Sequence, residues 1–467
     1  MLASTGIGSF VTSANLSTVN VAFPDLQASF EGESLASLGW VINAYTISFA
    51  AILLPAGKWA DSHGRRRVFY AGLWLFAFGS LVTGAAPTLP IVVLGRALQG
   101  IGGALIVPAS LGLLLEASPP NEITRSVALY GGITAIGVAT GPTLGAVIVD
   151  SAGWRWSFLL SLPFAFAAWF VGRNHLSTAR GARRQRVDAL GVVLAAMAMA
   201  SVSLAIVEGG NWGWTNARTI SAFVVGILAG AWFVLRCSHH PEPVLPLDLF
   251  RVRAFTLSTS ATVLFGAATG ALLLSNVLFL TGPWDYSIVR AGLAMSPSPV
   301  VAALAAPLVG RFGARLGERT IGVPGALILG GAVWWYHANV GLEPHYWSDW
   351  FPGAVMAGLG INMAFPMLQS SGVRDVGPER FSVANASTRA ALQVGTAVGV
   401  ALFVAILGER TNTLSDFRTA WVMIGIFATT TALLMAPIQS KSGALAGKQR
   451  KAVKRAKNAS VSGAWGR

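Results

Sequence analysis

The most chemically distinctive stretch of the sequence is a short charged segment, residues 57–67, between two long apolar runs. Its one carboxylate, Asp61, stands among four cations, and its two glycines permit a tight reversal of the chain. A carboxylate held by arginines on such a turn can act as an ion-pair latch that breaks when helices move apart. The alternative is a positively charged loop in which the acid is incidental. We assign the predicted latch to Gly57, Asp61, Gly64, Arg65 and Arg66.

A second candidate is Arg96, a lone cation inside the apolar run 90–115. If that run crosses a bilayer, a guanidinium there is unfavourable in lipid and should face the protein interior or a wet cavity. In that position Arg96 can bind an anionic group of a substrate, or support proton movement by pairing with an acid. The alternative is that the side chain extends to the outer membrane surface. Gln99 follows three residues later and shares its helix face.

The other polar side chains that we single out inside the apolar runs are neutral amides. They predict a polar, uncharged substrate cavity, although hydrogen bonding between helices is the alternative for each of them. The predicted cavity residues are Asn15, Asn43, Gln99, Asn276, Asn362 and Gln393. No acid lies in the middle of an apolar run, so a carboxylate that carries a proton must lie near a helix end, unless the coupling differs. The candidates for such a carboxylate are Asp25, Asp61, Glu116 and Glu208.

These residues belong to a chain whose composition is that of a helical membrane protein. Of 467 residues, 54% are hydrophobic and 11% are charged, and the mean hydropathy is +0.61. Soluble domains carry about 25% charged residues, so a chain this apolar cannot bury its surface in an aqueous core. The net charge of +14 fits positively charged cytosolic loops. No basic soluble domain that would bind nucleic acid is visible.

Cysteine usage and the absence of enzyme motifs narrow the function classes further. Cys237 is the only cysteine, so no internal disulfide can form. The sequence has no cluster of cysteines and histidines and no signature of a hydrolase or nucleotide-binding enzyme. It therefore predicts no metal site, no cofactor and no enzymatic activity.

Fourteen windows of the sequence are apolar enough to cross a membrane. They lie at about 5–24, 36–56, 68–86, 90–115, 125–149, 156–172, 189–207, 218–236, 254–280, 290–310, 321–339, 350–370, 388–408 and 418–437, against the ~20 apolar residues that a spanning helix needs. With both termini in the cytosol, most of the loop cations fall on the cytosolic side, as membrane proteins prefer. The sequence therefore predicts a multi-pass protein of the cell membrane with both termini cytoplasmic and its first span retained.

The charged segment is repeated later in the sequence, and the two copies divide the chain into two halves. Residues 310–319 repeat its glycine frame, with Gly317 in the place of Gly64. Ala314 stands where the first copy has Asp61, which predicts that only the first half carries the latch acid. An even number of spans separates the copies, so the halves are expected to be related by an axis along the membrane normal.

This repeat predicts an all-α membrane protein with fourteen transmembrane helices. Two six-helix bundles form a parallel pseudo-repeat, and two inserted helices stand between them. The predicted divisions are 1–172 for the N-terminal six-helix bundle, 173–253 for a linker with two additional transmembrane helices, 254–437 for the C-terminal six-helix bundle and 438–467 for a basic cytosolic tail.

Several stretches together resemble motifs of the major facilitator superfamily. They are residues 57–67 for its loop motif, 94–103 for its helix 4 motif, 137–145 for its antiporter motif and 14–24 for the helix 1 signature of its fourteen-spanner drug:proton antiporter branch. We assign proton or substrate coupling to Arg96 and Asp61. The branch usually has an aspartate where this chain has Asn15, and an asparagine cannot titrate.

The antiporter motif also has a physical interpretation of its own. Gly137, Gly141 and Gly145 repeat every four residues and give one smooth helix face for close packing. Pro142 lacks a backbone donor and bends the helix at this place. In the family that this motif resembles, the bend implies a gate that favours export.

The resemblance implies a secondary active transporter that exports amphipathic or cationic organic compounds, such as drugs and antibiotics, by alternating access coupled to proton influx. Its expected partners are a small-molecule substrate, the proton and the lipid bilayer, and we expect a monomer. One alternative is an exporter of a narrow metabolite or antibiotic substrate without tight proton coupling, which Asn15 favours. The other is a membrane sensor or scaffold that transports nothing.

Overall fold

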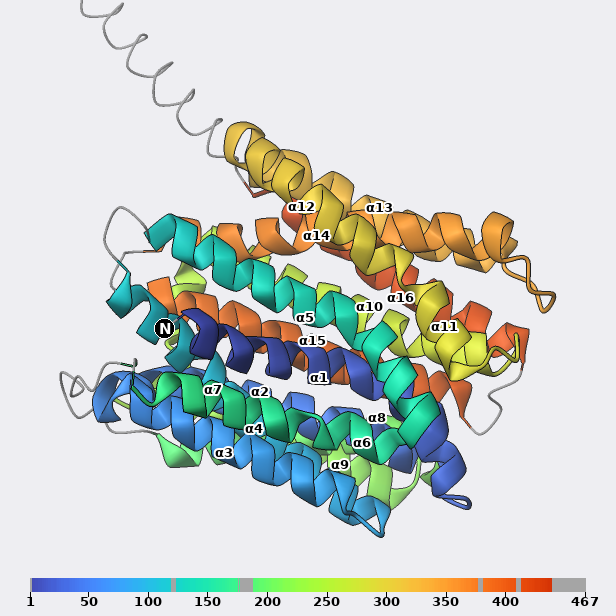
Figure 1. The fold of residues 1–467 in the computed structure, drawn as a ribbon, viewed down its shortest axis with the longest axis horizontal. Helices are drawn as coiled ribbons and strands as arrows, with labels where there is room; N and C mark the ends of the chain where they lie inside the picture. Colours follow the sequence, from blue (N-terminus) through green and yellow to red (C-terminus); the bar gives the residue numbers. More distant parts are fainter. Residues whose placement is uncertain are drawn as a thin grey trace, which may run out of the picture.

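The structure is a computed structural model that describes residues 2–118, 123–174, 176, 188–376, 381–408 and 413–438. Long helices run side by side along its longest axis (Figure 1). The helices before residue 173 are α1 (Leu2–Ser29), α2 (Leu35–His63), α3 (Arg65–Gly84), α4 (Leu89–Ala117), α5 (Ile123–Ala152), α6 (Trp154–Leu159) and α7 (Ser161–Gly172). Then follow α8 (Ala189–Trp212), α9 (Ala217–His239) and the short η1 (Leu247–Arg251). The remaining elements are α10 (Arg253–Thr281), α11 (Ile288–Met295), α12 (Pro297–Leu316), α13 (Glu318–Asn339), η2 (Tyr346–Trp350), α14 (Phe351–Arg374), α15 (Phe381–Leu407) and α16 (Leu414–Met435).

Eleven helical segments of the described chain are long and apolar enough to cross a membrane. They are Leu35–His63, Arg65–Gly84, Leu89–Ala117, Trp154–Gly172, Ala189–Trp212, Ala217–His239, Arg253–Thr281, Ile288–Gly313, Tyr346–Arg374, Val383–Leu407 and Leu414–Met435. Two of these segments contain a one-residue break, between α6 and α7 or between α11 and α12, and a third joins η2 directly to α14. The all-helical membrane fold that the sequence predicts is confirmed, and the eleven segments leave the count of fourteen spans open.

Single glycines reverse the chain at the two charged segments. Gly64 is the one residue between α2 and α3, and Gly317 is the one residue between α12 and α13. Their φ angles of 97° and 88° lie in the left-handed region, where glycine has no steric penalty. Gly57 is not part of the turn, because it lies inside α2, where a side chain would face Pro108 of α4. We call the end of the molecule that carries Gly64 and Gly317 the hairpin end, and the opposite end the far end.

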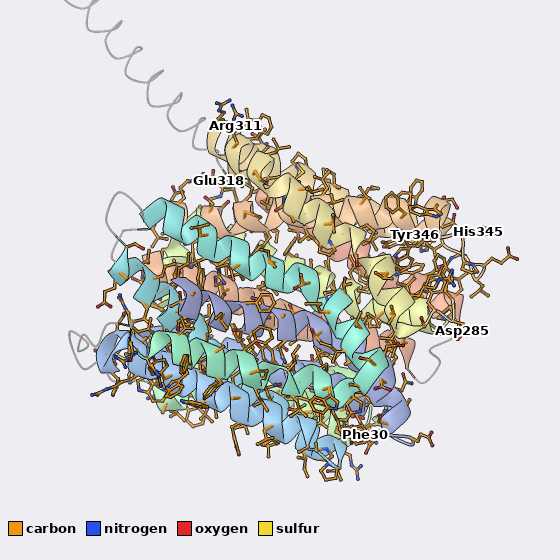
Figure 2. All side chains as sticks on the ribbon, viewed as in Figure 1. Phe30, Asp285, Arg311, Glu318, His345 and Tyr346 are labelled. Atoms are coloured by element: carbon orange, nitrogen blue, oxygen red, sulfur yellow. The ribbon has the colours of Figure 1, made fainter. Side chains whose placement is uncertain are left out.

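The two halves share one hydrophobic core at the far end. Figure 2 shows Arg311 and Glu318 at the hairpin end and Phe30, Asp285 and His345 at the far end. The larger core contains residues of α10 to α16 together with first-half residues from 19–26, 35–42, 86–92 and 146–158, all in the far-end parts of their helices. At the hairpin end, a second core belongs to the first half, except for Ala390 of α15.

Contacts at both ends of the pair α8 and α9 hold these two helices in place. At the far end, Ile206 and Val207 of α8 join the shared core, and α8 packs against both α2 and α15. At the hairpin end, the Asp188 carboxylate caps α8 through the Gly191 amide and binds the Arg236 Nε at 2.6 Å. Burial alone would raise the pKa of Asp188, but these two hydrogen bonds lower it below its ordinary value. Asp188 therefore stays charged, and it holds the hairpin-end termini of α8 and α9 together.

Candidate functional site

The centre of the candidate site is the guanidinium of Arg96, which α4 carries into the protein interior. Its side chain is 0% exposed, so it does not extend to the membrane surface. Its Nε donates to the Val41 carbonyl of α2 at 2.9 Å, and its Nη1 donates to the Asn15 Oδ1 of α1 at 2.5 Å. The same Nη1 donates to the Gln99 Oε1 at 2.7 Å. One cation therefore joins three helices that are far apart in the sequence.

Two aromatic rings complete the surroundings of this cation. The Arg96 Cζ lies 4.5 Å from the centroid of the Tyr45 ring and 5.4 Å from that of Phe158. Ring faces attract a buried guanidinium by about 0.5–2 kcal/mol each. No carboxylate of the described residues forms an ion pair with Arg96. The charge is thus stabilised by neutral oxygens and rings alone.

The hydrogen-bond chain continues from Arg96 into α3. The Gln99 Nε2 donates to the Ser80 Oγ at 2.7 Å, and the Ser80 hydroxyl donates to the Phe76 carbonyl at 2.9 Å. Because a guanidinium only donates, the amide oxygens of Asn15 and Gln99 must face it. The Nδ2 of Asn15 is then turned away, and neither it nor the Nη2 of Arg96 has a partner among the described residues.

A small cleft, partly open to the surroundings, adjoins this network. It lies between α1, α5 and the pair α6 and α7, and Asn15 is one of its lining residues. The full lining is Phe10, Val11, Ala14, Asn15, Thr18, Gly141, Leu144, Gly145, Ile148, Ser157, Leu160, Ser161 and Phe164. No residue in this lining is ionisable. The cleft is therefore apolar with a few neutral polar groups.

The glycines of the predicted antiporter motif bring α5 against α1. A Cβ on Gly137 would lie 2.8 Å from the Phe10 carbonyl oxygen, and one on Gly145 would lie 2.7 Å from the Thr18 Cγ2. The Thr18 hydroxyl donates to the Gly141 carbonyl at 3.1 Å. Pro142 lies inside α5, on the side that meets α11 near Gly292. The structure thus places this motif at two helix contacts, and its role in a gate stays a prediction.

At the hairpin end, Arg65 links the first charged segment to α4. Its Nη2 lies 3.0 Å from the Asp61 Oδ1, and its Nη1 donates to the Gly112 carbonyl at 3.0 Å and lies 3.7 Å from the Glu116 Oε2. Arg66 turns the other way and donates to the Arg173 carbonyl at 2.8 Å. The acid and the two arginines of the predicted latch therefore bind the first turn of α3 to its neighbours.

The second half has an acid at this place that the sequence comparison missed. Glu318 follows Gly317 directly, its Oε2 lies 3.2 Å from the Arg374 Nη1, and its Oε1 accepts from the Ser370 hydroxyl at 3.1 Å. The expectation that the second half lacks such an acid, because of Ala314, is wrong. Since Gly317 corresponds to Gly64, Glu318 takes the place of Arg65, and the ion pair has reversed polarity. Aligning the two segments and looking only for an acid opposite Asp61 gives Ala314, whereas the acid of the second segment stands opposite Arg65.

The remaining predicted cavity residues do not lie in the cleft. Asn43 is fully buried in α2, and its side chain has no partner among the described residues. Asn276 and Asn362 are half-buried and each keeps one amide atom unpaired, and Gln393 is buried in α15. The structure therefore brings Asn15, Gln99 and Arg96 together and leaves the other amides apart from the lining.

Reversing the charge of Glu318 should unfold the second charged segment. The side chains of Glu318 and Arg374 are 8% and 11% exposed, and a lysine at 318 would leave two buried cations facing each other. Breaking a buried pair costs about 3–5 kcal/mol. We expect Glu318→Lys to lower the thermal unfolding midpoint strongly, measured by size-exclusion chromatography after heating.

The double variant Glu318→Lys with Arg374→Glu is the control for this prediction. It restores opposite charges, so it should regain part of the lost stability. Recovery stays incomplete because Asp375, 3.0 Å from Arg374, would then face an acid. A single variant as stable as the wild-type protein would show that the pair has no structural role.

Comparison with known proteins gives a consistent result. The model of the family described as Major Facilitator Superfamily matches residues 5–400. The chain is 31% identical over 416 residues to the Multidrug resistance protein Stp of Mycobacterium tuberculosis, covering 87% of this chain and 75% of that protein. It is 30% identical over 420 residues to the Methylenomycin A resistance protein of Streptomyces coelicolor, covering 90% and 88%. It is 29% identical over 413 residues to the Tetracenomycin C resistance and export protein of Streptomyces glaucescens, covering 88% and 76%.

A solved structure has the same fold at low sequence identity. It comes from work on substrate recognition in proton-dependent oligopeptide transporters and superposes with a TM-score of 0.68. The match covers 93% of this chain and 97% of that chain, at 14% identity. At that identity the likeness concerns the fold alone.

Proposed function

The chain belongs to the Major Facilitator Superfamily, and from that premise we propose that it exports amphipathic organic compounds, antibiotics among them, out of the cell by alternating access. It is a multi-pass membrane transporter and not an enzyme. The observation that carries the proposal is its similarity, over most of the chain, to several antibiotic-resistance proteins. One of these relatives is described as an export protein.

The proposed topology has fourteen spans with both termini in the cytosol. The three long helices beyond the eleven apolar segments, α1, α5 and α13, have 28, 30 and 22 residues, and we assign them to the membrane as well. The loop cations then lie mainly in the cytosol, as expected for this side. The hairpin end is cytosolic in this topology, and α8 and α9 form the inserted pair between two six-helix bundles.

The packing of the halves supports alternating access. Because the shared core lies at the far end, the structure corresponds to a state that is closed toward the outside. Opening to the outside requires α2 to part from α15 and α5 to part from α11, since these pairs pack across the two halves. The hairpin ends would then approach each other, and the ion pairs at Arg65 and Glu318 would have to adjust.

Proton influx is the proposed driving force, although Asn15 cannot carry a proton. The acids to which we assign this coupling are Asp61 and Glu116, which share Arg65 at the hairpin end. Protonation of either carboxylate removes one of the charges that hold this arginine. The second candidate function, export of a narrow substrate without tight proton coupling, is favoured because no carboxylate of the described residues pairs with Arg96.

The test is an export assay in cells that lack their own multidrug pumps. We expect expression to reduce accumulation of tetracenomycin C or a comparable amphipathic antibiotic, and a protonophore to abolish the reduction. Reduced accumulation that persists with a protonophore would favour the second candidate. Unchanged retention of every compound, with and without the protonophore, would favour a sensor or scaffold that transports nothing.

Asp61→Asn should slow this export without preventing folding. The pair with Arg65 is partly exposed, at 56% and 34%, and such pairs contribute at most about 1 kcal/mol. We therefore expect the initial export rate to fall by no more than about fivefold, with normal membrane levels. Asp150→Asn is the matched control, because Asp150 is an exposed acid at the far end and should leave the rate unchanged. Equal rates for Asp61→Asn and wild type would remove Asp61 from the mechanism.

A further inference from the structure

We infer that the cleft beside Asn15 binds the carboxylate end of an amphipathic organic anion. Organic acids, and not permanent cations, would then be the preferred substrates. This inference rests on the export function proposed above and names the substrate class of the same site. Four observations lead to it: an uncompensated buried charge, two unpaired donors, the amide orientation of Asn15, and the lining of the cleft.

The first observation is the charge balance of the interior. Arg96 is fully buried, and its hydrogen-bond acceptors among the described residues are all neutral oxygens. Among the described residues, the buried acids are Asp188 and Glu318. Each of them already has an arginine partner at the hairpin end. A buried charge without a counter-charge is unfavourable by several kcal/mol, so the interior favours the entry of an anion over that of a cation.

The second observation is that the unpaired polar atoms at Arg96 are donors. The Nη2 of Arg96 and the Nδ2 of Asn15 have no acceptor among the described residues. A carboxylate accepts such hydrogen bonds, and bonds to an ionised group are the strong ones. A quaternary ammonium has no acceptor to offer, and it would also be repelled by the guanidinium. The two unpaired donors thus favour a negatively charged ligand over a positively charged one.

The amide of Asn15 connects these donors to the cleft. Asn15 is 4% exposed and lines the cleft, and its oxygen is held by Arg96. Two other polar groups of the lining are already engaged, because the Thr18 hydroxyl donates to the Gly141 carbonyl and the Ser157 hydroxyl donates to the Trp154 carbonyl. The amide NH₂ of Asn15 is thus an unpaired donor on a residue that lines the cleft.

The rest of the cleft suits the apolar body of such a compound. Its lining is mostly apolar, as in sites that bind small organic molecules. Phe10, Ile148 and Phe164 line it, and Leu144 and Leu160 at its outer side are 51% and 40% exposed. In the proposed topology these two leucines face the lipid. An amphiphile can thus enter from the bilayer with its carboxylate toward Asn15.

Equilibrium binding to the purified full-length protein tests the inference directly. The probes are dansyl-undecanoate and the same dansyl-labelled chain with a trimethylammonium group in place of the carboxylate. We expect the wild-type protein to bind the carboxylate probe at least about tenfold more tightly. Asn15→Asp places a carboxylate next to Arg96. The positive charge of Arg96 is then balanced by the protein itself, without a bound anion. This variant should bind the carboxylate probe about tenfold more weakly and should bind the trimethylammonium probe more tightly.

Asn216→Asp is the matched control. It makes the same change of charge at the exposed N-terminus of α9, where aspartate caps a helix as well as asparagine does. It should leave both affinities unchanged, and a shift equal to that of Asn15→Asp would overturn the inference as a surface-charge effect. Equal binding of both probes by wild type, or a carboxylate preference that survives Asn15→Asp, would also overturn it.

The binding and export experiments distinguish failure of the anion site from failure of the proposed function. Equilibrium binding needs no transport, so the predicted probe preference together with no export of any compound would keep the anion site and reject the proposed function. Export without a carboxylate preference would keep the proposed function and reject the anion site. Thermal unfolding of Asn15→Asp, expected at or above the wild-type midpoint because an ion pair is gained, shows that the variant is folded.

Discussion

Replacing Arg96 with alanine is expected to reduce export by about a hundredfold and to destabilise the first half of the protein. The substitution leaves the oxygens of Asn15 and Gln99 buried without their donor. Each orphaned group costs about 1–3 kcal/mol. It also removes the group between the rings of Tyr45 and Phe158, which opens a cavity between α2 and α6. Transport into inverted membrane vesicles and thermal unfolding of the purified protein measure the two effects.

Arg96→Lys separates the role of the charge from that of the hydrogen bonds. Lysine keeps the positive charge, but its single nitrogen cannot reproduce the planar fork that holds Val41 and Asn15 at the same time. We expect Lys to retain the preference for anionic probes and to recover only part of the stability. Full export and stability in Arg96→Ala would show that the network is dispensable.

Replacing Gly395 with alanine is expected to prevent stable folding. In the contact between α10 and α15, a Cβ on Gly395 would collide with the Val263 carbonyl oxygen, and one on Gly399 would collide with Ala267. The obstacle in both cases is a helix backbone, which cannot move aside as a flexible side chain can. Overpacking typically costs 1–3 kcal/mol, and a backbone obstacle places this variant at about 3 kcal/mol or more. The yield of monodisperse protein after size-exclusion chromatography is the measurement.

Gly210→Ala is the control for this effect. A Cβ on Gly210 in α8 would meet nothing within 4 Å, and alanine is the better helix former. Its yield and unfolding midpoint should equal or slightly exceed those of the wild-type protein. If both glycine variants behaved alike, close approach of α10 and α15 would not limit stability.

The sequence predicts the helices of this protein better than the contacts between them. The windows 189–207 and 218–236 correspond to α8 and α9, since long apolar runs follow directly from composition. The window 290–310 is instead divided between α11 and α12 at Ser296. Pro297 follows this residue and has no backbone N–H, so it cannot donate to the carbonyl of Leu293 and the hydrogen-bond ladder is interrupted here.

The candidate site illustrates the same limit. The cost of a charge in lipid is enough to predict that Arg96 faces inward. Its bond to Asn15, 81 residues away, depends on how α1 packs against α4, and no local pattern encodes that. The hydrogen bonds that pair Arg96 with neutral oxygens, and so leave its charge uncompensated, are likewise a product of tertiary packing.

The opposite polarity of the two hairpin ion pairs has a consequence for how a newly made chain assembles. In a protein with two similar halves, the turn of one half can pair wrongly with the helix end of the other half, because the turns and the helix ends resemble each other. Here the wrong pairing of Arg65 with Arg374 would join two cations, and that of Glu318 with Glu116 would join two acids. Misplaced like charges are unfavourable by several kcal/mol. Each turn thus pairs favourably only with the helix of its own half. The reversed polarity therefore disfavours wrong pairing between the halves while the chain inserts into the membrane.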